Sequence, residues 1–448
     1  MTSYAEKTAR LLADLGSAQS SEAVAIGLAK RTSNLFRERA HRPAPRLDLS
    51  HFNRPLRVDP SAAVVEAEGM TTFEDLADAT LAVGAMPAVV PQLKSITLGG
   101  AVAGVGIEAT SFRHGLVHDT IEALDVLTGE GRIVSCTAHN EHRDLFHGFP
   151  NSYGTLGYAL KLTARTIPVK RYVRVDHARF ADPATYCAAL ADRCNDSDAD
   201  FVDGVVFDRT HLVLSSGRFV QDAPYVSDYT YERIYYRSLC EKRVDYLRTR
   251  DYLWRWDTDW FWCSKNVGAQ NPLVRRLFGR RRLNSITYQK IMRWNARWRV
   301  MGRINRLRGL HTEAVIQDVD IPIAQAGEFL EFLFAEVGVL PIWICPIRAP
   351  DPAALATLYP LPEGTLSINF GFWDTVTSRV PRPPGSVNRA IERKVTALGG
   401  VKSLYSDSYF TEDEFWSIYD RDAYNALKQR YDPGNRLPDL YEKAVLRR

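Results

Sequence analysis

The sequence lacks the features that mark several large classes of protein. It has six cysteines in 448 residues, and no two of them form a C-x-x-C pair. No window reaches about 18 uninterrupted apolar residues, so no membrane-spanning helix is predicted. The first residues, Met1 to Lys7, contain no apolar signal core. We therefore expect a cytoplasmic protein whose cysteines are reduced and lie in the core.

Several catalytic and binding motifs are also missing. There is no G-x-S-x-G elbow and no Walker loop, so hydrolase and phosphotransferase functions find no support. The net charge of +4 is small for this length, and no known nucleic-acid-binding module accompanies it, so we expect no nucleic-acid partner. His139, His142 and His147 imitate a metal-ligand spacing, but they fall on a polar stretch, and we expect no metal site.

What is present indicates an α+β protein of two or three domains. Helices and strands mix without regular β-α-β spacing, which argues against a doubly wound sheet. Thr71–Glu74 has the capping-box pattern and predicts a helix whose apolar face runs from Phe73 to Leu81 and which Gly84 ends. Ile121–Leu127 and Arg132–Cys136 flank a glycine turn and predict a hairpin. Thr411–Tyr431 predicts one helical stretch.

The most informative segment runs from Thr97 to Gly115 and reads TLGGAVAGVGIEATSFRHG. Its glycines alternate with small or aliphatic residues, so a flat or charged ligand can lie directly on the backbone. Successive uncovered N–H groups there can cradle a pyrophosphate. Gly104 to Ala109 satisfies the G-x-G-x-x-G/A motif. However, the run follows no buried strand and leads into a stretch without helical period, which argues against a Rossmann turn.

This run and the segments after it resemble a known family. TLGGAVAGVGIEAT, the hairpin, Ser152–Gly157 and Thr166–Lys170 look like the FAD-binding domain of the vanillyl-alcohol oxidase/p-cresol methylhydroxylase superfamily. Phe201–Gly204, Leu340–Pro346 and Leu404–Tyr409 resemble, in the same order, the delta24-sterol reductase branch with its bacterial relatives. The ordered set covers nearly the whole chain.

The resemblance implies an organisation and a cofactor. A two-subdomain FAD-binding domain of the p-cresol methylhydroxylase type would occupy 1–170, an α+β substrate or cap domain 171–400, and a C-terminal segment that returns to the flavin 401–448. The linking histidine is missing from this branch, so we expect non-covalent FAD even though His114 lies close to the run. The residues implied to contact FAD are Arg31, Ser33, Thr97, Leu98, Gly99, Gly100, Ala101, Val102, Ala103, Gly104, Val105, Gly106, Ile107, Glu108, Ala109, Thr110, Ser111 and Ile167.

The implied activity is FAD-dependent reduction of a carbon–carbon double bond in a lipid, with NADPH or NADH as a transient donor. The lipid would be a methylene-branched fatty acyl chain or a sterol side chain. The alkene needs a hydride from the flavin and a proton from a positioned acid. Candidate catalytic residues are Tyr409, Tyr405, Asp407 and Glu108, although a buried, satisfied hydroxyl is the plainer reading of each tyrosine. Two alternatives stay open: an alcohol or sugar oxidase or dehydrogenase of the same superfamily, and a lipid-binding protein that has lost its flavin.

A basic, aromatic stretch lies at 261–312. It contains no Asp or Glu, and Ile291, Trp294, Trp298 and Met301 recur at helical spacing. Such a helix suits the interface of an anionic membrane. It suits equally well a tryptophan-lined core helix whose arginines meet acids elsewhere. The first interpretation predicts peripheral contact through 275–308 with the inner face of the membrane, and the oligomeric state is left open.

Overall fold

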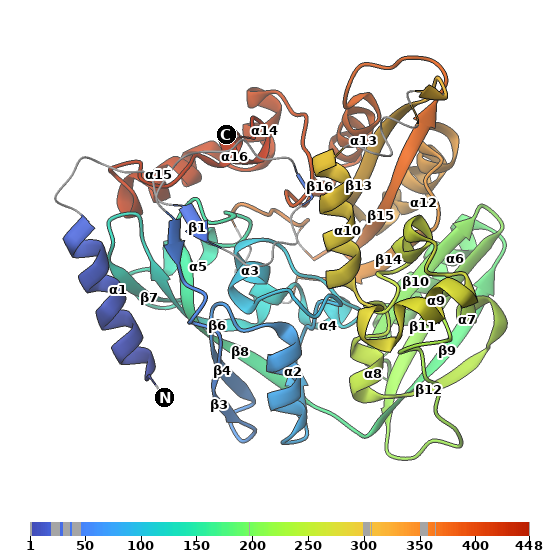
Figure 1. Ribbon diagram of the computed structural model, residues 1–448, viewed down its shortest axis with the longest axis horizontal. Coiled ribbons are helices and arrows are strands. Elements are labelled where there is room, and N and C mark those ends of the chain that lie inside the picture. Colours follow the sequence, from blue (N-terminus) through green and yellow to red (C-terminus); the bar gives the residue numbers. More distant parts are fainter. Residues whose placement is uncertain are drawn as a thin grey trace.

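The computed structural model describes residues 2–18, 27–29, 36–37, 46–196, 198–298, 305, 307–349, 357–362 and 364–447. Over these residues the protein contains two antiparallel sheets, one in each half of Figure 1. It also has a small parallel pair, β1 (Gly27–Ala29) with β2 (Arg46–Asp48). Helices and strands are mixed along the chain, as expected for the α+β class.

The first sheet has the order β3-β4-β8-β6-β7, and β5 pairs with the end of β8. Its strands are β3 (Pro55–Asp59), β4 (Val64–Glu68), β5 (Ala85–Pro87), β6 (Ile121–Leu127), β7 (Ile133–Thr137) and β8 (Tyr158–Pro168). Every second residue of β8 is buried, including Leu160, Leu162 and Ala164. This alternation is typical of a strand with one face on the core.

The second sheet has the order β12-β9-β11-β10-β14-β15-β13-β16. Its strands are β9 (Tyr172–Phe180), β10 (Phe201–Asp208), β11 (His211–Val220), β12 (Val244–Arg248), β13 (His311–Pro322), β14 (Ile342–Ile347), β15 (Ser367–Ser378) and β16 (Val401–Lys402). One face, which includes Ile344 and Phe370, is apolar and packs under α6, α12 and α13. The opposite face carries Trp343, which shares a core cluster with Leu98 of the glycine run.

That opposite face also carries buried polar groups. Asp320 is paired with Asn369 across β13 and β15, and Asn369 with Cys345 across β15 and β14. Asp203 of β10 is buried as well. Because paired residues in a ladder share a face, these polar groups look toward the first half of the chain.

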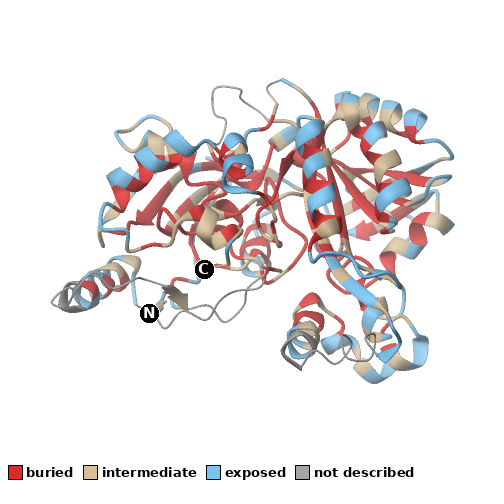
Figure 2. Cartoon of the chain, turned by 90° about the horizontal axis from the view of Figure 1, so that it is seen from above, coloured by how far each residue is buried: buried red, intermediate tan, exposed pale blue. Residues whose placement is uncertain are grey.

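Helices surround both sheets. They are α1 (Tyr4–Ala18), α2 (Phe73–Leu81), α3 (Leu98–Ala103), α4 (Ser111–His114), α5 (Arg143–Gly148), α6 (Pro183–Asn195), α7 (Tyr235–Glu241), α8 (Thr249–Leu253), α9 (Pro272–Phe278), α10 (Ser285–Trp298), α12 (Ile323–Phe332), α13 (Ser386–Ala397), α14 (Glu412–Ile418), α15 (Arg421–Tyr431) and α16 (Leu440–Ala444). Figure 2 shows buried residues gathered in the strands and exposed residues on the outer sides of the helices. None of the described helices is long and apolar enough to cross a membrane.

The C-terminal helices, red in Figure 1, lie over the first half of the chain. Tyr431, at the end of α15, donates a hydrogen bond to Asp144 of α5 at 2.7 Å. Leu427 occupies the space over Gly148, where a Cβ would lie 2.2 Å from the leucine Cδ1. The end of the chain therefore packs beside the elements that follow the glycine run.

The local predictions are confirmed with small shifts. The predicted hairpin is β6 with β7. Helix α2 is capped by Thr72, whose Oγ1 accepts from Asp75 N at 3.2 Å. The predicted cap at Thr71 is therefore wrong by one residue, because Thr71 is itself fully buried. The predicted stretch ending at Tyr431 is two helices, since Asp420 has a φ of 47° and caps the second. The stretch expected to lack a helix after the glycine run contains the short α4.

Candidate functional site

The first half of the glycine run is α3, which packs on the first sheet through its backbone. Thr97 caps it, with Oγ1 accepting from Gly100 N at 3.2 Å. Gly99 N donates to the Gly69 carbonyl at 2.8 Å, and a Cβ on Gly99 would lie 2.8 Å from that oxygen. Glycine is required here for close backbone packing. The predicted cradle of uncovered amides is wrong for this half, because its N–H groups already have acceptors.

The second half of the run keeps amides available. The N–H groups of Val105, Gly106 and Ile107 have no hydrogen-bond partner among the described residues. Tyr153 closes one side, because a Cβ on Gly104 would lie 3.4 Å from the tyrosine ring. Consecutive free amides are the groups that bind phosphate oxygens. This half therefore suits an anionic ligand.

Glu108, near the end of the run, is tied to the second sheet by a buried ion cluster. Arg255 Nη2 lies 2.7 Å from Glu108 Oε1 and 2.8 Å from Asp203 Oδ2, and no member is more than 2% exposed. The guanidinium lies 4.0 Å from the Tyr252 ring centroid. Burial raises the pKa of Glu108, while Arg255 opposes the rise. The geometry favours a positioning role for Glu108 over the predicted catalytic one.

Tyr405 meets a separate group of acids on the second sheet. Its hydroxyl accepts a hydrogen bond from Trp373 Nε1 at 2.8 Å and lies beside the Asp318 carboxyl. Asp318 lies on β13 opposite Gly371. Burial raises the pKa of Asp318 well above its ordinary value, Tyr405 opposes the rise, and Asp320 adds to it. The surroundings of the Asp318 carboxyl therefore favour its protonated form.

Asp320, two residues further along β13, is 2% exposed and fully bonded. Its carboxylate accepts from Tyr359 Oη at 2.7 Å and from Asn369 Nδ2 at 2.7 Å. Burial raises the pKa of Asp320 to about 6, against the two hydrogen bonds, which lower it. Asp318 and Asp320 therefore differ in environment, as paired acids with distinct roles do.

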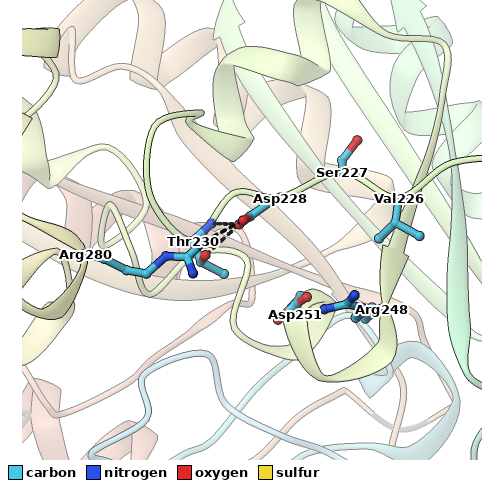
Figure 3. A pocket seen from close by; sticks show the side chains of 7 residues that line it. All are labelled: Val226, Ser227, Asp228, Thr230, Arg248, Asp251 and Arg280. Atoms are coloured by element: carbon cyan, nitrogen blue, oxygen red, sulfur yellow. Dashed lines mark hydrogen bonds and ion pairs between the residues drawn. The ribbon is translucent and has the colours of Figure 1, made fainter. Parts of the chain in front are cut away.

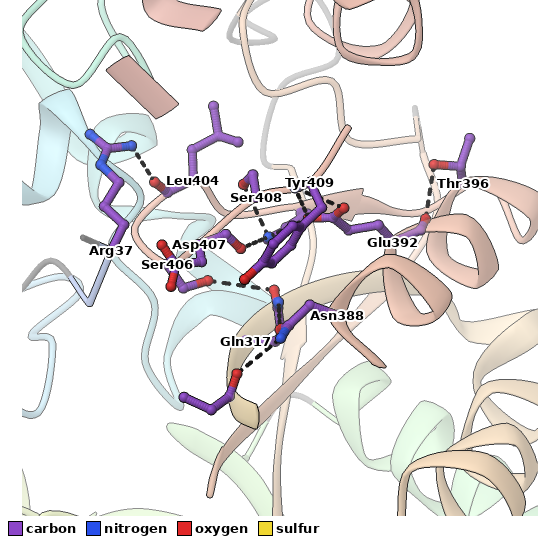
Figure 4. A network of polar contacts seen from close by, with 12 residues as sticks. Arg37, Gln317, Asn388, Glu392, Thr396, Leu404, Ser406, Asp407, Ser408 and Tyr409 are labelled. Carbon is purple, nitrogen blue, oxygen red and sulfur yellow. Dashed lines mark hydrogen bonds and ion pairs between the residues drawn. The ribbon is translucent and has the colours of Figure 1, made fainter. Parts of the chain in front are cut away.

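Asp407 and Tyr409 belong to a different network, which contains Glu392 (Figure 4) and the lysine paired with it, Lys402. Lys402 Nζ lies 2.7 Å from Glu392 Oε1 with both side chains buried. Glu392 also accepts from Tyr409 N at 3.1 Å, and the Asp407 carbonyl accepts from Lys402. The Tyr409 hydroxyl accepts from Arg447 at 3.3 Å. The predicted catalytic segment is thus divided: Tyr405 lies beside Asp318, whereas Tyr409 and Asp407 lie beside Lys402, Glu392 and Arg447.

Aromatic rings cover the side on which Tyr405 and Asp318 lie. We call Phe36, Trp260, Phe261, Trp343 and Trp373 the aromatic wall. The Phe261 centroid lies 4.3 Å from that of Trp373 and 5.4 Å from that of Trp343. Phe36 lies 5.4 Å from Trp260 and 5.7 Å from Tyr405. The wall offers an apolar surface whose ring faces attract positive charge.

The remaining predicted residues are dispersed. Ile167 lies in β8 opposite Met86. His114 lies on α4, where burial lowers its pKa to about 4. His142 hydrogen-bonds Tyr431, and the described residues contain no group of three or more ligands placed to hold a metal. Arg31 and Ser33 fall outside the described residues.

A surface pocket of about 330 Å³ lies elsewhere on the molecule (Figure 3). It is lined by Val226, Ser227, Asp228, Thr230, Arg248, Asp251 and Arg280. Asp228 is already paired with Arg280 at 2.7 Å and accepts from Thr230 N at 2.7 Å. None of the predicted site residues lines this pocket, and we assign no chemistry to it.

Comparison with known proteins shows what the chain is similar to. A model of the FAD binding domain matches residues 22–137, which contain the glycine run. Delta(24)-sterol reductase of Homo sapiens is 26% identical over 403 residues, covering 87% of this chain and 75% of that protein. The Delta(24)-sterol reductase of Pisum sativum is 26% identical over 449 residues, covering 89% and 76%. Cytokinin dehydrogenase 7 of Oryza sativa subsp. japonica is 29% identical over 150 residues, covering 33% and 28%. The resemblance inferred from the sequence motifs is confirmed.

The residues around the run fit an FAD. Several buried polar atoms there have no hydrogen-bond partner among the described residues: Thr71 Oγ1, Gln92 Nε2, Thr110 Oγ1, Asn151 Oδ1 and Ser152 Oγ. Thr71 and Asn151 touch the run directly, since the Thr71 carbonyl accepts from Leu98 N and Asn151 N donates to the Gly104 carbonyl. Buried polar groups are rarely left unpaired in a folded protein. A polar ligand such as FAD, bound along the run, would give these atoms hydrogen-bond partners.

Proposed function

We propose that this FAD-dependent oxidoreductase reduces an isolated carbon–carbon double bond in a lipid, with NADPH or NADH as the electron donor. The observation that carries the proposal is the half-buried Asp318–Tyr405 pair beside the aromatic wall. Tyr153 connects this pair to the run, since it packs against Gly104 and its pKa responds to the Asp318 charge. Similarity over most of the chain to Delta(24)-sterol reductases supports the same class of reaction.

The chemistry of an unactivated alkene matches this surface. When bound and reduced, FAD supplies a hydride to one alkene carbon. The other carbon needs a proton, and no carbonyl is present to be polarised, so positive charge develops on the hydrocarbon. In a pocket without water, that charge must be met by groups fixed in the protein. The ring faces of the aromatic wall attract it and exclude water from the reacting carbons.

The cofactor would be held non-covalently along the glycine run. The amides of Val105, Gly106 and Ile107 would face its diphosphate. The unpaired side-chain atoms of Gln92, Thr110 and the residues near Gly104 would bind its remaining polar groups. The lipid would be a sterol side chain, as the names of the relatives indicate, or a methylene-branched fatty acyl chain.

Rapid mixing under anaerobic conditions tests the proposal. NADPH or NADH should bleach the flavin absorbance of the purified protein, whereas alcohols and sugars should leave it unchanged. The opposite pattern would replace the proposal with an alcohol or sugar oxidase or dehydrogenase, as a match to a dehydrogenase also allows. A colourless protein that does not take up added FAD would support the flavin-free lipid-binding alternative. Lipid profiling of a deletion strain, for an accumulated alkene precursor, identifies the lipid.

We further propose that the protein is cytoplasmic and docks on the inner face of an anionic membrane through α9 and α10. Leu273 and Leu277, one turn apart on α9, are 70% and 82% exposed, and Trp294 is 57% exposed. Arg276 and Arg280 are beside them and more than half exposed. Exposed apolar side chains flanked by cations suit an anionic bilayer surface.

Not all of the basic stretch is available for docking. Arg275 is 3% exposed and forms a two-point ion pair with Asp259 at 2.6 and 2.9 Å. Arg275, on α9, is therefore one arginine of the stretch that meets an acid in another segment of the chain. The side chains of Trp298 and Met301 lie outside the described residues.

Vesicle sedimentation tests the docking surface. Leu273→Ser with Leu277→Ser should weaken binding to vesicles that contain phosphatidylglycerol by at least about tenfold, because two apolar side chains no longer enter the bilayer. Val380→Ser is the matched control, because Val380 is 69% exposed and far from α9 in sequence. Equal binding by the double variant and the control would contradict the proposal.

A further inference from the structure

We infer that Asp318 is the group that gives the proton to the alkene, and that Tyr405 positions its carboxyl. This inference rests on the proposed function and adds a residue that the sequence analysis did not name. It makes Asp318 a catalytic residue and Tyr405 a positioning residue.

The place of Asp318 in the sheet aims its carboxyl at the aromatic wall. Its direct neighbour on β15 is Gly371, where a Cβ would lie 2.6 Å from Asp318 Oδ1 and 2.6 Å from the Trp373 ring. The glycine therefore leaves the space that the carboxyl and the indole share. A side chain at this position would push the carboxyl away from Trp373.

The same carboxyl has an unused oxygen. Asp318 Oδ1 is buried and has no hydrogen-bond partner among the described residues. An unpaired buried carboxylate is costly, so the group keeps its proton instead of ionising. A protonated carboxyl with one free side is able to donate to a substrate placed against it.

The charged and titratable neighbours agree with a neutral acid. Asp320 on the same strand, Tyr405 on the C-terminal segment and Tyr153 beside the run are the ionisable groups that interact with Asp318. None of the three carries a positive charge, so none stabilises the carboxylate as an ion pair would. Asp320, with two hydrogen bonds and a pKa of about 6, is the acid of the pair that ionises at neutral pH.

Asp318 is a better donor than Tyr405, although both face the wall. Burial raises the pKa of the Tyr405 phenol well above 10, and the Asp318 charge raises it further. A phenol in this state is a weaker acid than a carboxyl, and proton donation to an alkene needs the stronger acid. The Tyr405 hydroxyl, fixed by Trp373 Nε1 at 2.8 Å, instead holds the carboxyl in place.

The O–H bond of Asp318 breaks and a C–H bond forms at the less substituted alkene carbon, leaving positive charge on the more substituted one. FAD, once reduced with the two electrons of NADPH or NADH, would supply the hydride for the second C–H bond. The nicotinamide loses two electrons and the alkene gains them. Asp318, left as a carboxylate beside the cation, takes its next proton from water.

The variants Asp318→Asn and Tyr405→Phe test the inference against a matched pair on the same sheet. Tyr229 donates its hydroxyl to the buried carboxylate of Asp245 on β12, the strand at the other edge. Asp245→Asn and Tyr229→Phe therefore remove an Asp–Tyr contact that includes no residue of the wall, and Asp245 differs from Asp318 in being paired with Lys242 at 2.8 Å.

Measuring the two half-reactions separately distinguishes proton donation to the alkene from reduction of the flavin by NADPH. Flavin reduction by NADPH should be unchanged in Asp318→Asn, while flavin re-oxidation by the lipid alkene should slow by about 100-fold or more. Tyr405→Phe should slow re-oxidation by about tenfold. It should also move the alkaline limit of that step to higher pH, since Tyr405 lowers the Asp318 pKa. Both variants of the control pair should re-oxidise at the wild-type rate. Equal rates in Asp318→Asn and Asp245→Asn would overturn the inference.

Infrared spectroscopy gives a readout that does not depend on turnover. The purified protein at neutral pH should show the C=O absorption of a protonated carboxyl that is lost in Asp318→Asn and kept in Asp245→Asn. A spectrum unchanged by Asp318→Asn would mean that Asp318 is ionised, and the inference fails. If wild-type protein reduces no alkene, the proposed function fails instead, whatever the infrared result.

Discussion

Replacing Arg255 with methionine should destabilise the protein severely, because Arg255 is the cation of a buried cluster with two carboxylates. Its guanidinium holds Glu108 at 2.7 Å and Asp203 at 2.8 Å, and Arg255 itself is 0% exposed. Removing one partner of a buried ion pair costs about 3–5 kcal/mol, since the other charge stays buried and uncompensated. Here two carboxylates lose their cation together, so we expect the upper part of that range.

The partner substitution should be much milder. Glu108→Gln keeps an oxygen that accepts from Arg255, and it removes an ionised group whose pKa is already raised by burial. Arg255 still pairs with Asp203, which also accepts from Trp343 Nε1 at 3.3 Å. We expect a loss of only about 1–2 kcal/mol. The combination of Arg255→Met, Glu108→Gln and Asp203→Asn should regain at least about 2 kcal/mol over Arg255→Met alone, because no buried charge remains.

Urea unfolding of the flavin-free proteins, followed by tryptophan fluorescence, measures these differences without a contribution from cofactor binding. The reasoning is refuted if Arg255→Met lies within about 1 kcal/mol of the wild type. It is also refuted if Glu108→Gln is as destabilising as Arg255→Met. In that case the stability of the cluster would depend on the charge of Glu108, and not on the neutralisation of the buried carboxylates by Arg255.

Three further predictions follow from particular contacts. Gly99→Ala should weaken FAD binding by more than about tenfold, because its Cβ would displace α3 from the Gly69 carbonyl. A fluorescence titration measures the affinity, with Gly327→Ala as the control because the space around Gly327 is open. Equal affinities of the two variants for FAD would disprove the contact argument. Asp320→Asn should flatten the pH dependence of stability. Folding raises the pKa of Asp320 from 3.8 to about 6, so the free energy of unfolding of the wild type falls on the order of 3 kcal/mol as the pH rises from 3.8 to 6. Parallel curves of unfolding free energy against pH for the two proteins would contradict this. The thiol of Cys345 is fully buried, and burial raises its pKa well above 9. Under native conditions it should therefore react with a thiol reagent more slowly than the thiol of the partly exposed Cys240. The reverse order in a labelling time course would be inconsistent with the described packing.

The parts of the fold that the sequence predicted are those set by local patterns. The hairpin and helix α2 each follow from the residues within them. The glycine run was identified because its small residues are contiguous. Its amides were misjudged, since the acceptors for Gly99 N and its neighbours come from a segment about thirty residues away.

The parts that could not be predicted depend on contacts between distant segments. Arg255 meets Glu108 across 147 positions of sequence, and Tyr405 meets Trp373 across 32. One local signal did exist. Asp318 and Asp320 alternate with Val319 and Ile321 in a strand, so two acids share one face of an otherwise apolar segment. Because charged residues are rarely buried without a role, two acids on one face of such a strand indicate a functional surface.

The most direct test of the account is whether the reduced flavin of this protein gives its electrons to an alkene. Protein reduced with NADPH is mixed without oxygen with a sterol that has a side-chain double bond, and separately with a methylene-branched phospholipid. The account predicts that the oxidised flavin absorbance returns with at least one of them, in step with the saturated lipid detected by mass spectrometry. A flavin that stays reduced with both lipids, and is re-oxidised only when oxygen is admitted, would contradict it.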